Sequence, residues 1–472
     1  MDKLDIAVVS IYVISLVIYA TWFVRNAPDA KSYFLAGRSF AWPIIGISIL
    51  ATNFSGNGFI GSTGGGHAYG LAQANFDWIG AIPAIIIAAF IFVPRLWKMG
   101  LYSIPEYLGT RYDQYIRVIA GLYTACITTI TASAALWAIA LTLKTYADIP
   151  VFYGILLTTT LVGLYTIRGG MTAIAATDLL QMTVISVATL GAVWYSISSL
   201  GGVNSFIDTV NTLDASHFQV FLPASHEILP WPGVVLGLAL VLAPAHWMGS
   251  QIILQRTFAA RSAADAKKGL LLVAVGKLFF PLLYVVPGII VFAMQADLQY
   301  SDQALPWLMK NVLPHGMAGL LLVALIAAFQ STLDSSLNSI SLVITRDVYG
   351  VLSSKPINEL MWGKILTFIV LLVAALLTPI ISRSMGIYIF IQTALSVFQG
   401  PMFAILIFGV FSKWANKIGA YTCIVCGLST SLLLNILDVN FLYVAFWSFS
   451  ISVIGLAAGS WAARSTVFPN LK

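Results

Sequence analysis

Four ionisable side chains fall within long apolar stretches of this sequence: Asp77, Asp178, Lys277 and Asp334. A charged side chain at the centre of a bilayer costs roughly 2.5–3.5 kcal/mol on insertion scales. Residues of this kind usually bind an ion or a solute, or relay a proton. The other charged residues fall in connecting segments or at the ends of apolar stretches, so these four are the first candidates for chemistry.

The segment 327–338, with the sequence AAFQSTLDSSLN, places hydroxyl groups on one face of a helix. Ala328, Ser331, Thr332 and Ser335 follow one another at helical spacing, and we call them the hydroxyl face. A small, hard cation prefers oxygen ligands and accepts neutral ones. A packing stripe of small residues, each hydroxyl bonded back to its own helix, explains the same pattern. The pattern by itself leaves both interpretations open.

Structural explanations compete at three of the four charges. Asp178 could pair with an arginine at the inner end of the membrane, of which Arg168 is nearest in sequence, instead of adding its charge to the hydroxyl face. Asp77 begins an apolar stretch and could cap a helix. Lys277 has no acid in its own stretch and could extend its amine to the membrane surface.

Motifs of enzymes and of ATP-driven pumps are absent from the sequence. The glycine-rich segment Gly64–Gly66 lacks the Gly-Lys-Ser/Thr of a nucleotide-binding loop. His67 and His246 have no metal-ligand spacing, so we expect them to form hydrogen bonds in the core. Cys423 and Cys426 form a CxxC inside an apolar stretch, without a second pair, and predict neither metal nor redox chemistry. We therefore expect a protein that is not an enzyme.

The composition places these residues in a membrane protein. Of 472 residues, 59% are hydrophobic and 9% are charged, whereas soluble domains carry about a quarter charged residues. Stretches of about 20 apolar residues cross a bilayer as helices. We predict an all-α, polytopic membrane protein with thirteen spans. They lie at 5–24, 41–70, 75–97, 117–147, 151–167, 172–199, 231–255, 269–295, 315–345, 361–381, 386–411, 418–437 and 441–462.

The basic residues predict which end of each span faces the cell interior. The formal net charge is +6, and no basic cluster interleaved with aromatic residues indicates nucleic-acid binding. With the N-terminus outside, 19 of the 24 lysines and arginines fall in inside loops, Arg168 and Arg256 among them. Such an excess is typical of cytoplasmic loops. We therefore predict a multi-pass protein of the plasma (inner) membrane, with the N-terminus outside and the C-terminus in the cytoplasm.

Two spans carry glycine, proline and small polar residues at mid-membrane. The span 41–70 contains ATNFSGNGF at 51–59, and the span 231–255 contains APAHWMGS at 243–250. Unwound backbone at this depth is tolerated where it lines a buried or watery site. Each interrupted span opens a set of five spans, and the two enter the membrane from opposite sides. This arrangement is typical of secondary transporters with a site at the midplane; two kinked helices packed through small residues are the alternative.

Several motifs together resemble one family of membrane proteins. They are Tyr33-Phe-Leu-Ala-Gly-Arg38, the Ala-Thr-Asn-Phe-Ser break, Gly169-Gly with Thr177-Asp178, Gln255-Arg-Thr257, and the run from Ser331 to Asn338 followed by Arg346-Asp-Val-Tyr349. From about residue 30 to about residue 420 the chain is similar to the sodium/solute symporter family, in particular to its sodium/sugar cotransporter-like branch. The resemblance implies a leucine-transporter-type fold, in which two inverted repeats of five helices are accompanied by flanking helices.

By position, the resemblance implies a main sodium site between the first break and the hydroxyl face. Its ligands would be the carbonyls of Ala51, Phe54 and Ala328 and the hydroxyls of Ser331 and Thr332. Some members hold a second sodium ion, for which the matching residues are Asp178, Asp334 and Ser335. The family often has a hydroxyl where this chain has Asp334, so the number of sodium ions stays open.

The resemblance also implies a solute site and its gates. The residues at solute-contacting positions are Asn53, Asn57, Gln73, Asp77, Lys277 and Gln392. The gate residues are Phe76 and Tyr388 on the outer side and His246 with Trp247 on the inner side. Two positions differ from the sugar-transporting branch, because a sugar-contacting glutamine is Gly58 here and an inner aromatic gate residue is His246. The solute is therefore expected to be a sugar or a sugar-like compound, without being fixed further.

The spans and the resemblance together predict the order of parts along the chain. It begins with an extra transmembrane helix and a cytoplasmic loop (1–40). A first inverted repeat of five helices (41–200), an extracellular loop (201–230), a second inverted repeat of five helices (231–412) and two C-terminal transmembrane helices (413–472) follow.

The sequence thus predicts a secondary active transporter that moves Na⁺ together with a small polar organic solute by alternating access. Sodium or proton coupling to a carboxylate-bearing solute (sialic acid, an amino acid or a monocarboxylate) is the nearer alternative, since Lys277 suits a carboxylate. A channel or a solute sensor is the alternative of another class. The expected partners are the solute, sodium ions and the lipid bilayer, without nucleic acid, and the chain is expected to act as a monomer.

Overall fold

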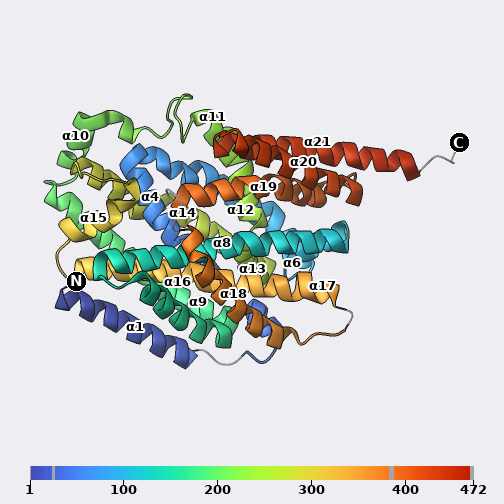
Figure 1. Ribbon diagram of the computed structural model, residues 1–472, viewed down its shortest axis with the longest axis horizontal. Coiled ribbons are helices and arrows are strands. Elements are labelled where there is room, and N and C mark those ends of the chain that lie inside the picture. Colours follow the sequence, from blue (N-terminus) through green and yellow to red (C-terminus); the bar gives the residue numbers. More distant parts are fainter. Residues whose placement is uncertain (1, 24–26, 354, 382–386, 468–472) are drawn as a thin grey trace.

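The computed structural model describes residues 2–23, 27–353, 355–381 and 387–467. This part of the chain is built of helices and contains no strand, only two isolated backbone bridges. Most of the long helices run lengthwise through the molecule (Figure 1). The expectation of an all-α, polytopic protein is therefore confirmed.

The helices follow the apolar stretches of the sequence. In the first half they are α1 (Lys3–Phe23), α2 (Ala30–Leu35), α3 (Trp42–Asn53), α4 (Gly56–Tyr69), α5 (Ile82–Ile87), α6 (Val93–Lys98), α7 (Ile104–Arg111), α8 (Gln114–Ala147), α9 (Val151–Ser199) and α10 (Val203–Asp214). In the second half they are α11 (Trp231–Gly233), α12 (Ala243–Gly249), α13 (Gln251–Phe258), α14 (Ala263–Ala293), α15 (Ala304–Asn311), α16 (Met317–Val343), α17 (Gly350–Leu352), α18 (Glu359–Ile381), α19 (Ile387–Phe411), α20 (Lys417–Ile436) and α21 (Phe441–Val467). Wider, π-type turns occupy Asp77–Ala81, Ala88–Phe92, Val234–Leu242 and Ile344–Tyr349, and 3-10 turns occupy Ala36–Arg38, Gly70–Phe76, Ala215–Phe218 and Ser301–Gln303.

Ten helices in the described part of the chain are long and apolar enough to cross a membrane, so the predicted number of thirteen is not confirmed. The predicted span 41–70 consists of two separate helices, α3 and α4. The predicted spans 151–167 and 172–199 follow one another within α9, which is interrupted at Gly170 (φ 55°, ψ −145°). A side chain at Gly170 would be strained at this positive φ and would meet the Tyr33 carbonyl at 2.2 Å, so glycine is required at the interruption.

The first interrupted span is broken where the sequence predicts. Phe54 leaves the helical conformation (φ −73°, ψ 58°) at the end of α3. Ser55 then caps α4, because its hydroxyl accepts a hydrogen bond from the Gly58 N–H at 2.9 Å. Gly56 lets the start of α4 approach α16, since a methyl group there would lie 2.0 Å from the Phe329 ring. The carbonyls at the end of α3 are left without partners in their own helix.

The second interrupted span is also broken at the predicted place. α12 and α13 are separated by Ser250, whose backbone is extended (φ −70°, ψ 122°). Pro244 lies within the helical run Trp231–Gly249, directly after the π-type turns of Val234–Leu242, and removes one backbone donor there. The terminal backbone groups at both breaks must therefore find partners outside their own helices.

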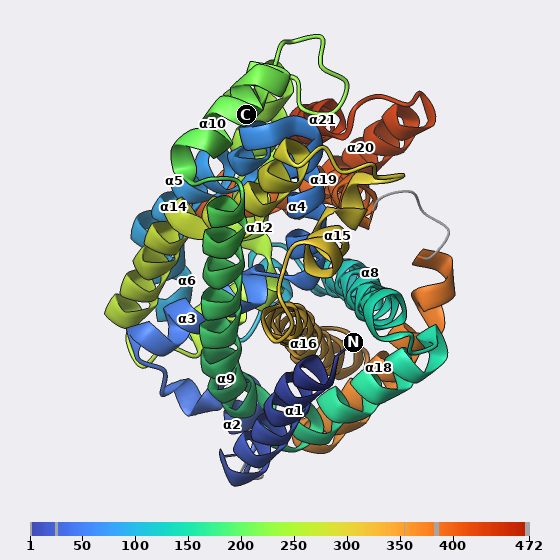
Figure 2. The same ribbon diagram turned by 90° about the vertical axis from the view of Figure 1, so that its left-hand side faces the viewer.

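α16 lies in the interior of the molecule (Figure 2). It contacts α9, α8, α1, α18, α4 and α3. Nearly all of its side chains from Leu321 to Val343 are buried, including every residue of the hydroxyl face. A helix buried on all sides must find partners for its polar groups within the protein, and those partners define the candidate site.

The two ends of the described chain lie at opposite ends of the bundle. α1 begins at one end and α21 finishes at the other (Figure 1). α10 and α15 lie at the end where α1 begins, which agrees with an external segment over 201–230. An odd number of membrane crossings places the two chain ends on opposite sides of the membrane, as observed here. Which of these sides faces the cytoplasm stays a prediction.

Candidate functional site

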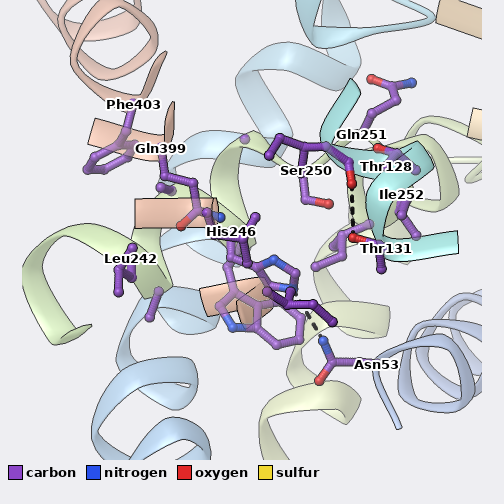
Figure 3. Close-up of a pocket in the computed structure, with 18 of the residues that line it drawn as sticks. Asn53, Thr128, Thr131, Leu242, His246, Ser250, Gln251, Ile252, Gln399 and Phe403 are labelled. Atoms are coloured by element: carbon purple, nitrogen blue, oxygen red, sulfur yellow. Dashed lines mark hydrogen bonds between the residues drawn. The ribbon is translucent and has the colours of Figure 1, made fainter. Parts of the chain in front are cut away.

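A cavity of about 300 Å³ is lined by residues of both broken helices (Figure 3). Further wall residues come from α7, α8, α14, α16 and α19. The structure thus brings segments more than 300 residues apart in sequence around one space. Most of the predicted solute and gate residues line it, namely Asn53, Phe76, Asp77, His246, Trp247, Lys277 and Gln392.

Of the other three predicted residues, the structure describes the side chain of Gln73 alone, and Gln73 is not among the wall residues. Gln73 is buried next to the cavity, and its Nε2 lies 3.3 Å from the hydroxyl of Ser62, which does line it. Gln73 therefore contacts a wall residue without lining the cavity itself, and its role stays a prediction. The side chains of Asn57 and Tyr388 lie outside the described part of the chain, so their roles stay predictions.

Asp77 and Lys277 form an ion pair in the cavity wall. Lys277 Nζ lies 2.6 Å from Asp77 Oδ1, and the two side chains are 5% and 4% exposed. Tyr284, two turns along α14 from Lys277, donates its hydroxyl to Asp77 Oδ2. The amine also lies 4.4 Å from the centre of the Phe280 ring, at a distance that favours a cation–π interaction. Both structural alternatives are therefore wrong: Asp77 binds α14 instead of capping its own helix, and Lys277 does not extend to the membrane surface.

His246 and Asn53 connect the two broken helices directly. His246 lies in the last turn of α12, and Asn53 is the last residue of α3. The distance from His246 Nε2 to Asn53 Nδ2 is 3.3 Å (Figure 3). The Trp247 ring stands edge-on to the imidazole, with 5.5 Å between ring centres. His246 is thus placed to hold the ends of α3 and α12 together at one side of the cavity.

We expect loss of the His246–Asn53 hydrogen bond to lower solute uptake roughly 2- to 10-fold, since such a bond contributes about 0.5–1.5 kcal/mol. The measurement is a double-mutant cycle of uptake with His246→Phe, Asn53→Ala and the combined variant. The phenyl ring keeps the planar shape of the imidazole without its nitrogens. If the two single losses simply multiply in the combined variant, the residues act independently and the contact has no part in transport.

Three of the residues predicted for the main sodium site, Ala328, Ser331 and Thr332, lie on α16 beside Thr52 of α3. The Thr332 hydroxyl donates to the Ala328 carbonyl of its own helix at 3.0 Å, as the packing alternative expects, and lies 3.4 Å from the Thr52 carbonyl. Ser331 Oγ lies 3.3 Å from Thr52 Oγ1. Hydroxyl and carbonyl oxygens thus converge from two helices, and this is the chemistry that a hard cation prefers. The predicted ligands in this region are Ala51, Phe54, Ala328, Ser331 and Thr332, all of which are buried.

Asp178 is fully buried on α9 and pairs with Arg256. Arg256 Nη2 lies 3.3 Å from Asp178 Oδ2, and the two side chains are 1% and 0% exposed. The other carboxylate oxygen accepts a hydrogen bond from the Ser331 hydroxyl. The alternative that Asp178 pairs with an arginine is therefore confirmed, but the partner is Arg256 and not Arg168, which is exposed. The placement of Arg256 in an inside loop is wrong, since its guanidinium is buried among helices.

Asp334 is buried on α16 and belongs to the same network through Ser335. The Ser335 hydroxyl donates to Asp334 Oδ1 at 3.1 Å and accepts a hydrogen bond from Arg256 Nη2. Ser335 Oγ also lies 3.1 Å from Thr52 Oγ1. The residues predicted for a second sodium ion are therefore near one another, with a guanidinium group among them.

Four polar residues of the site were not singled out from the sequence. Ser48 and Thr52 are four residues apart and share a face of α3, so helical spacing ahead of the first break is a signal for them. Tyr284 shares a face of α14 with Lys277 by the same rule. Arg256 carries no such signal, because an arginine near the end of an apolar stretch is equally typical of an inside loop.

Two broken helices at corresponding places, a cavity between them and buried charges in its wall define a class of protein. Broken membrane helices around a site at the midplane of the bilayer are typical of secondary transporters. The molecule is a membrane transporter of the alternating-access kind.

The family follows from the sequence as a whole. A model of the sodium:solute symporter family matches residues 33–427, and the chain belongs to this family. Its members are transporters and not enzymes, and sodium is their coupling ion. The expected family, the expected cofactor Na⁺ and sodium-coupled symport are thereby confirmed.

Curated relatives match nearly the whole chain. The sodium/glucose cotransporter of Vibrio parahaemolyticus is 30% identical over 471 residues, which cover 93% of this chain and 86% of the relative. The sodium/myo-inositol cotransporter 2 of Mus musculus is 30% identical over 477 residues, which cover 93% of this chain and 71% of the relative.

Solved structures show the fold. A sodium-coupled sialic acid symporter in a substrate-bound, outward-open state superposes with a TM-score of 0.87 at 23% identity, over 98% of each chain. A nucleobase-cation-symport-1 family transporter superposes with a TM-score of 0.56 at 14% identity, over 95% of this chain and 96% of the other. The leucine-transporter-type fold is therefore confirmed, whereas the exact repeat boundaries stay predictions.

Proposed function

We propose that this chain carries a neutral polyhydroxy solute, a sugar or a polyol, together with sodium. The observation that carries the proposal is the charge balance of the cavity. Among the described wall residues, Asp77 and Lys277 are the only ones from the group Asp, Glu, Lys and Arg, and they neutralise each other. A solute with a net charge would be left unpaired in a largely apolar wall, which is costly; a neutral solute would not.

The polar groups of the wall suit hydroxyl groups in particular. A hydroxyl donates one hydrogen bond and accepts others, so it needs both kinds of partner. Asp77 accepts, Lys277 donates, and the amides of Asn53 and Gln392 do both. Trp247 offers an apolar face for the ring carbons of such a solute. The names of the sodium/glucose and sodium/myo-inositol relatives support the same class.

Coupling to sodium follows from the position of Thr332. This residue belongs to the predicted sodium group and also lines the cavity. A sodium ion between α3 and α16 would fix the end of α3, including Asn53, and so complete the solute site. One charge that moves through 100 mV supplies about 2.3 kcal/mol, which corresponds to a solute gradient of roughly 50-fold per ion.

We infer further that the chain acts as a monomer in the plasma membrane, with its N-terminus outside and its C-terminus in the cytoplasm. The excess of basic residues in the predicted inside loops supports this orientation. A carboxylate-bearing solute is the second candidate. It is favoured by Lys277, whose amine could exchange Asp77 for a carboxylate of the solute.

A solute panel in proteoliposomes tests this proposal. The purified chain is reconstituted, and uptake of labelled glucose, galactose, myo-inositol, sialic acid, proline and lactate is measured with sodium or choline outside. We expect sodium-dependent uptake of a neutral sugar or polyol. Uptake of the acids or proline alone would reject the solute class, and uptake driven by a pH gradient in choline would reject sodium as the ion used for this solute.

A further inference from the structure

Arg256 has an unusual environment for an arginine. Its side chain is 1% exposed and comes from the last turn of α13. The guanidinium donates from Nε to Ser48 Oγ at 2.6 Å and from Nη2 to Thr52 Oγ1 at 2.6 Å. The same Nη2 also contacts Ser335 Oγ and Asp178 Oδ2. Oxygens from α3, α9 and α16 therefore surround one buried cation.

The surrounding oxygens are of the kind that bind a monovalent metal ion. They comprise one carboxylate, from Asp178, and three hydroxyls, from Ser48, Thr52 and Ser335. Such a set of hard oxygen ligands suits sodium. In this chain the positive charge is supplied by the guanidinium, which stays protonated at all physiological pH values. The Arg256 guanidinium therefore supplies the positive charge that these four oxygens surround.

The cluster directly adjoins the predicted main sodium ligands. Ser331 donates its proton to Asp178 Oδ1, while Oδ2 of the same carboxylate faces Arg256. Because its proton points to Asp178, Ser331 can turn a lone pair towards an ion at the main site. Asp178 is thus a positioning residue for Ser331, and Arg256 in turn holds Asp178.

A second sodium ion at Asp178 would meet the fixed charge of Arg256. Two unit charges about 4 Å apart repel strongly enough to weaken binding roughly a thousand-fold at an effective dielectric constant of about 20. The formal charges agree with this. Asp178, Asp334 and Arg256 together carry one net negative charge when both acids are ionised, which one sodium ion balances and a second would exceed.

We propose that Arg256 is a resident cation that fills the oxygen cluster of Asp178, Ser48, Thr52 and Ser335, and that this chain therefore binds one sodium ion per transport cycle. The inference rests on the proposed main site for that ion. The Arg256 guanidinium thus takes the place of the second sodium ion that the resemblance allows.

Binding of ²²Na⁺ to the purified full chain in detergent tests the proposal without any solute. We expect saturable binding of one ion per chain with a Hill coefficient near 1, and binding of that ion roughly 10- to 100-fold weaker in Ser331→Ala. Two ions per chain would overturn this inference and leave the main site standing. No bound sodium would overturn both, so the two failures are distinguishable.

Variants of Arg256 separate a resident cation from a merely structural ion pair. Arg256→Gln uncovers the Asp178 carboxylate, and we expect it to bind two sodium ions per chain. Asp178→Asn combined with Arg256→Gln removes both charges and should return the number to one. The control is Arg261→Gln, an arginine nearby in sequence that is 60% exposed and pairs with Asp265; it should bind one ion.

A folded Arg256→Gln protein that still binds one ion would overturn the proposal. Folding is judged by a single symmetric peak in size-exclusion chromatography. If that variant does not fold, the count of ions on the unmodified chain decides: one supports the resident cation and two overturns it.

Discussion

Asp77→Asn and Lys277→Gln, each made alone, are expected to reduce solute uptake about 100-fold or more. Each substitution leaves the partner charged and buried, and loss of one member of a buried pair costs about 3–5 kcal/mol. Asp77 has a second role, because it also accepts the Tyr284 hydroxyl. The measurement is the KM and kcat of sodium-driven uptake in proteoliposomes, together with the thermal unfolding midpoint of the purified protein.

The combined variant Asp77→Asn/Lys277→Gln tells a solute contact from a structural pair. The combined variant leaves no unpaired buried charge, so we expect the unfolding midpoint to recover most of its value. Uptake should stay low, since the charged partners for solute hydroxyls are gone. Recovery of uptake along with stability would show that the pair only supports the fold.

Arg117 and Asp347 provide the matched control for this experiment. They form an ion pair of 2.8 Å between α8 and the turn that follows α16, with Asp347 fully buried. Neither residue lines the cavity. Arg117→Gln/Asp347→Asn is therefore expected to leave the KM for the solute as in the unmodified chain, with an unfolding midpoint close to that of the unmodified chain.

Ser331→Ala and Thr332→Ala are expected to raise the sodium concentration for half-maximal uptake roughly 10- to 100-fold each. Each removes one hydroxyl that we predict to bind the ion, and a polar contact to a charged group contributes about 1.5–3 kcal/mol. At saturating sodium the maximal rate should be largely retained. The measurement is the sodium dependence of uptake at constant ionic strength, with choline as the replacement cation.

Two further substitutions in α16 control for damage to the helix. Thr332→Ser keeps the hydroxyl and should respond to sodium nearly as the unmodified chain does. Ser341→Ala removes an equally buried hydroxyl, which donates to the Asn338 carbonyl of its own helix, and should leave the sodium response unchanged. If Ser331→Ala and Thr332→Ala also leave it unchanged, the sodium ion binds elsewhere.

Local features of the chain could be predicted from its sequence. The low fraction of charged residues predicted a membrane protein. Small polar residues at 51–59 and 243–250 correctly predicted where both helices are broken. These properties depend on the hydrogen bonding and burial of one segment at a time. Helical spacing likewise placed Ser331 and Thr332 on one face. The count of thirteen spans is not confirmed in the described part of the chain, because Trp42–Asn53 and Val151–Gly163 are shorter than a span and Gly58–Lys98 is one continuous run.

Pairing between helices was decided by the tertiary structure. The sequence indicated that Asp77, Lys277 and Asp178 were buried charges, but not which groups they meet. Asp77 pairs with Lys277 across 200 residues, and Asp178 pairs with Arg256 across 78. Helical periodicity tells which face of its own helix a residue occupies. It does not tell which two helices face each other, because that depends on the packing of the whole bundle.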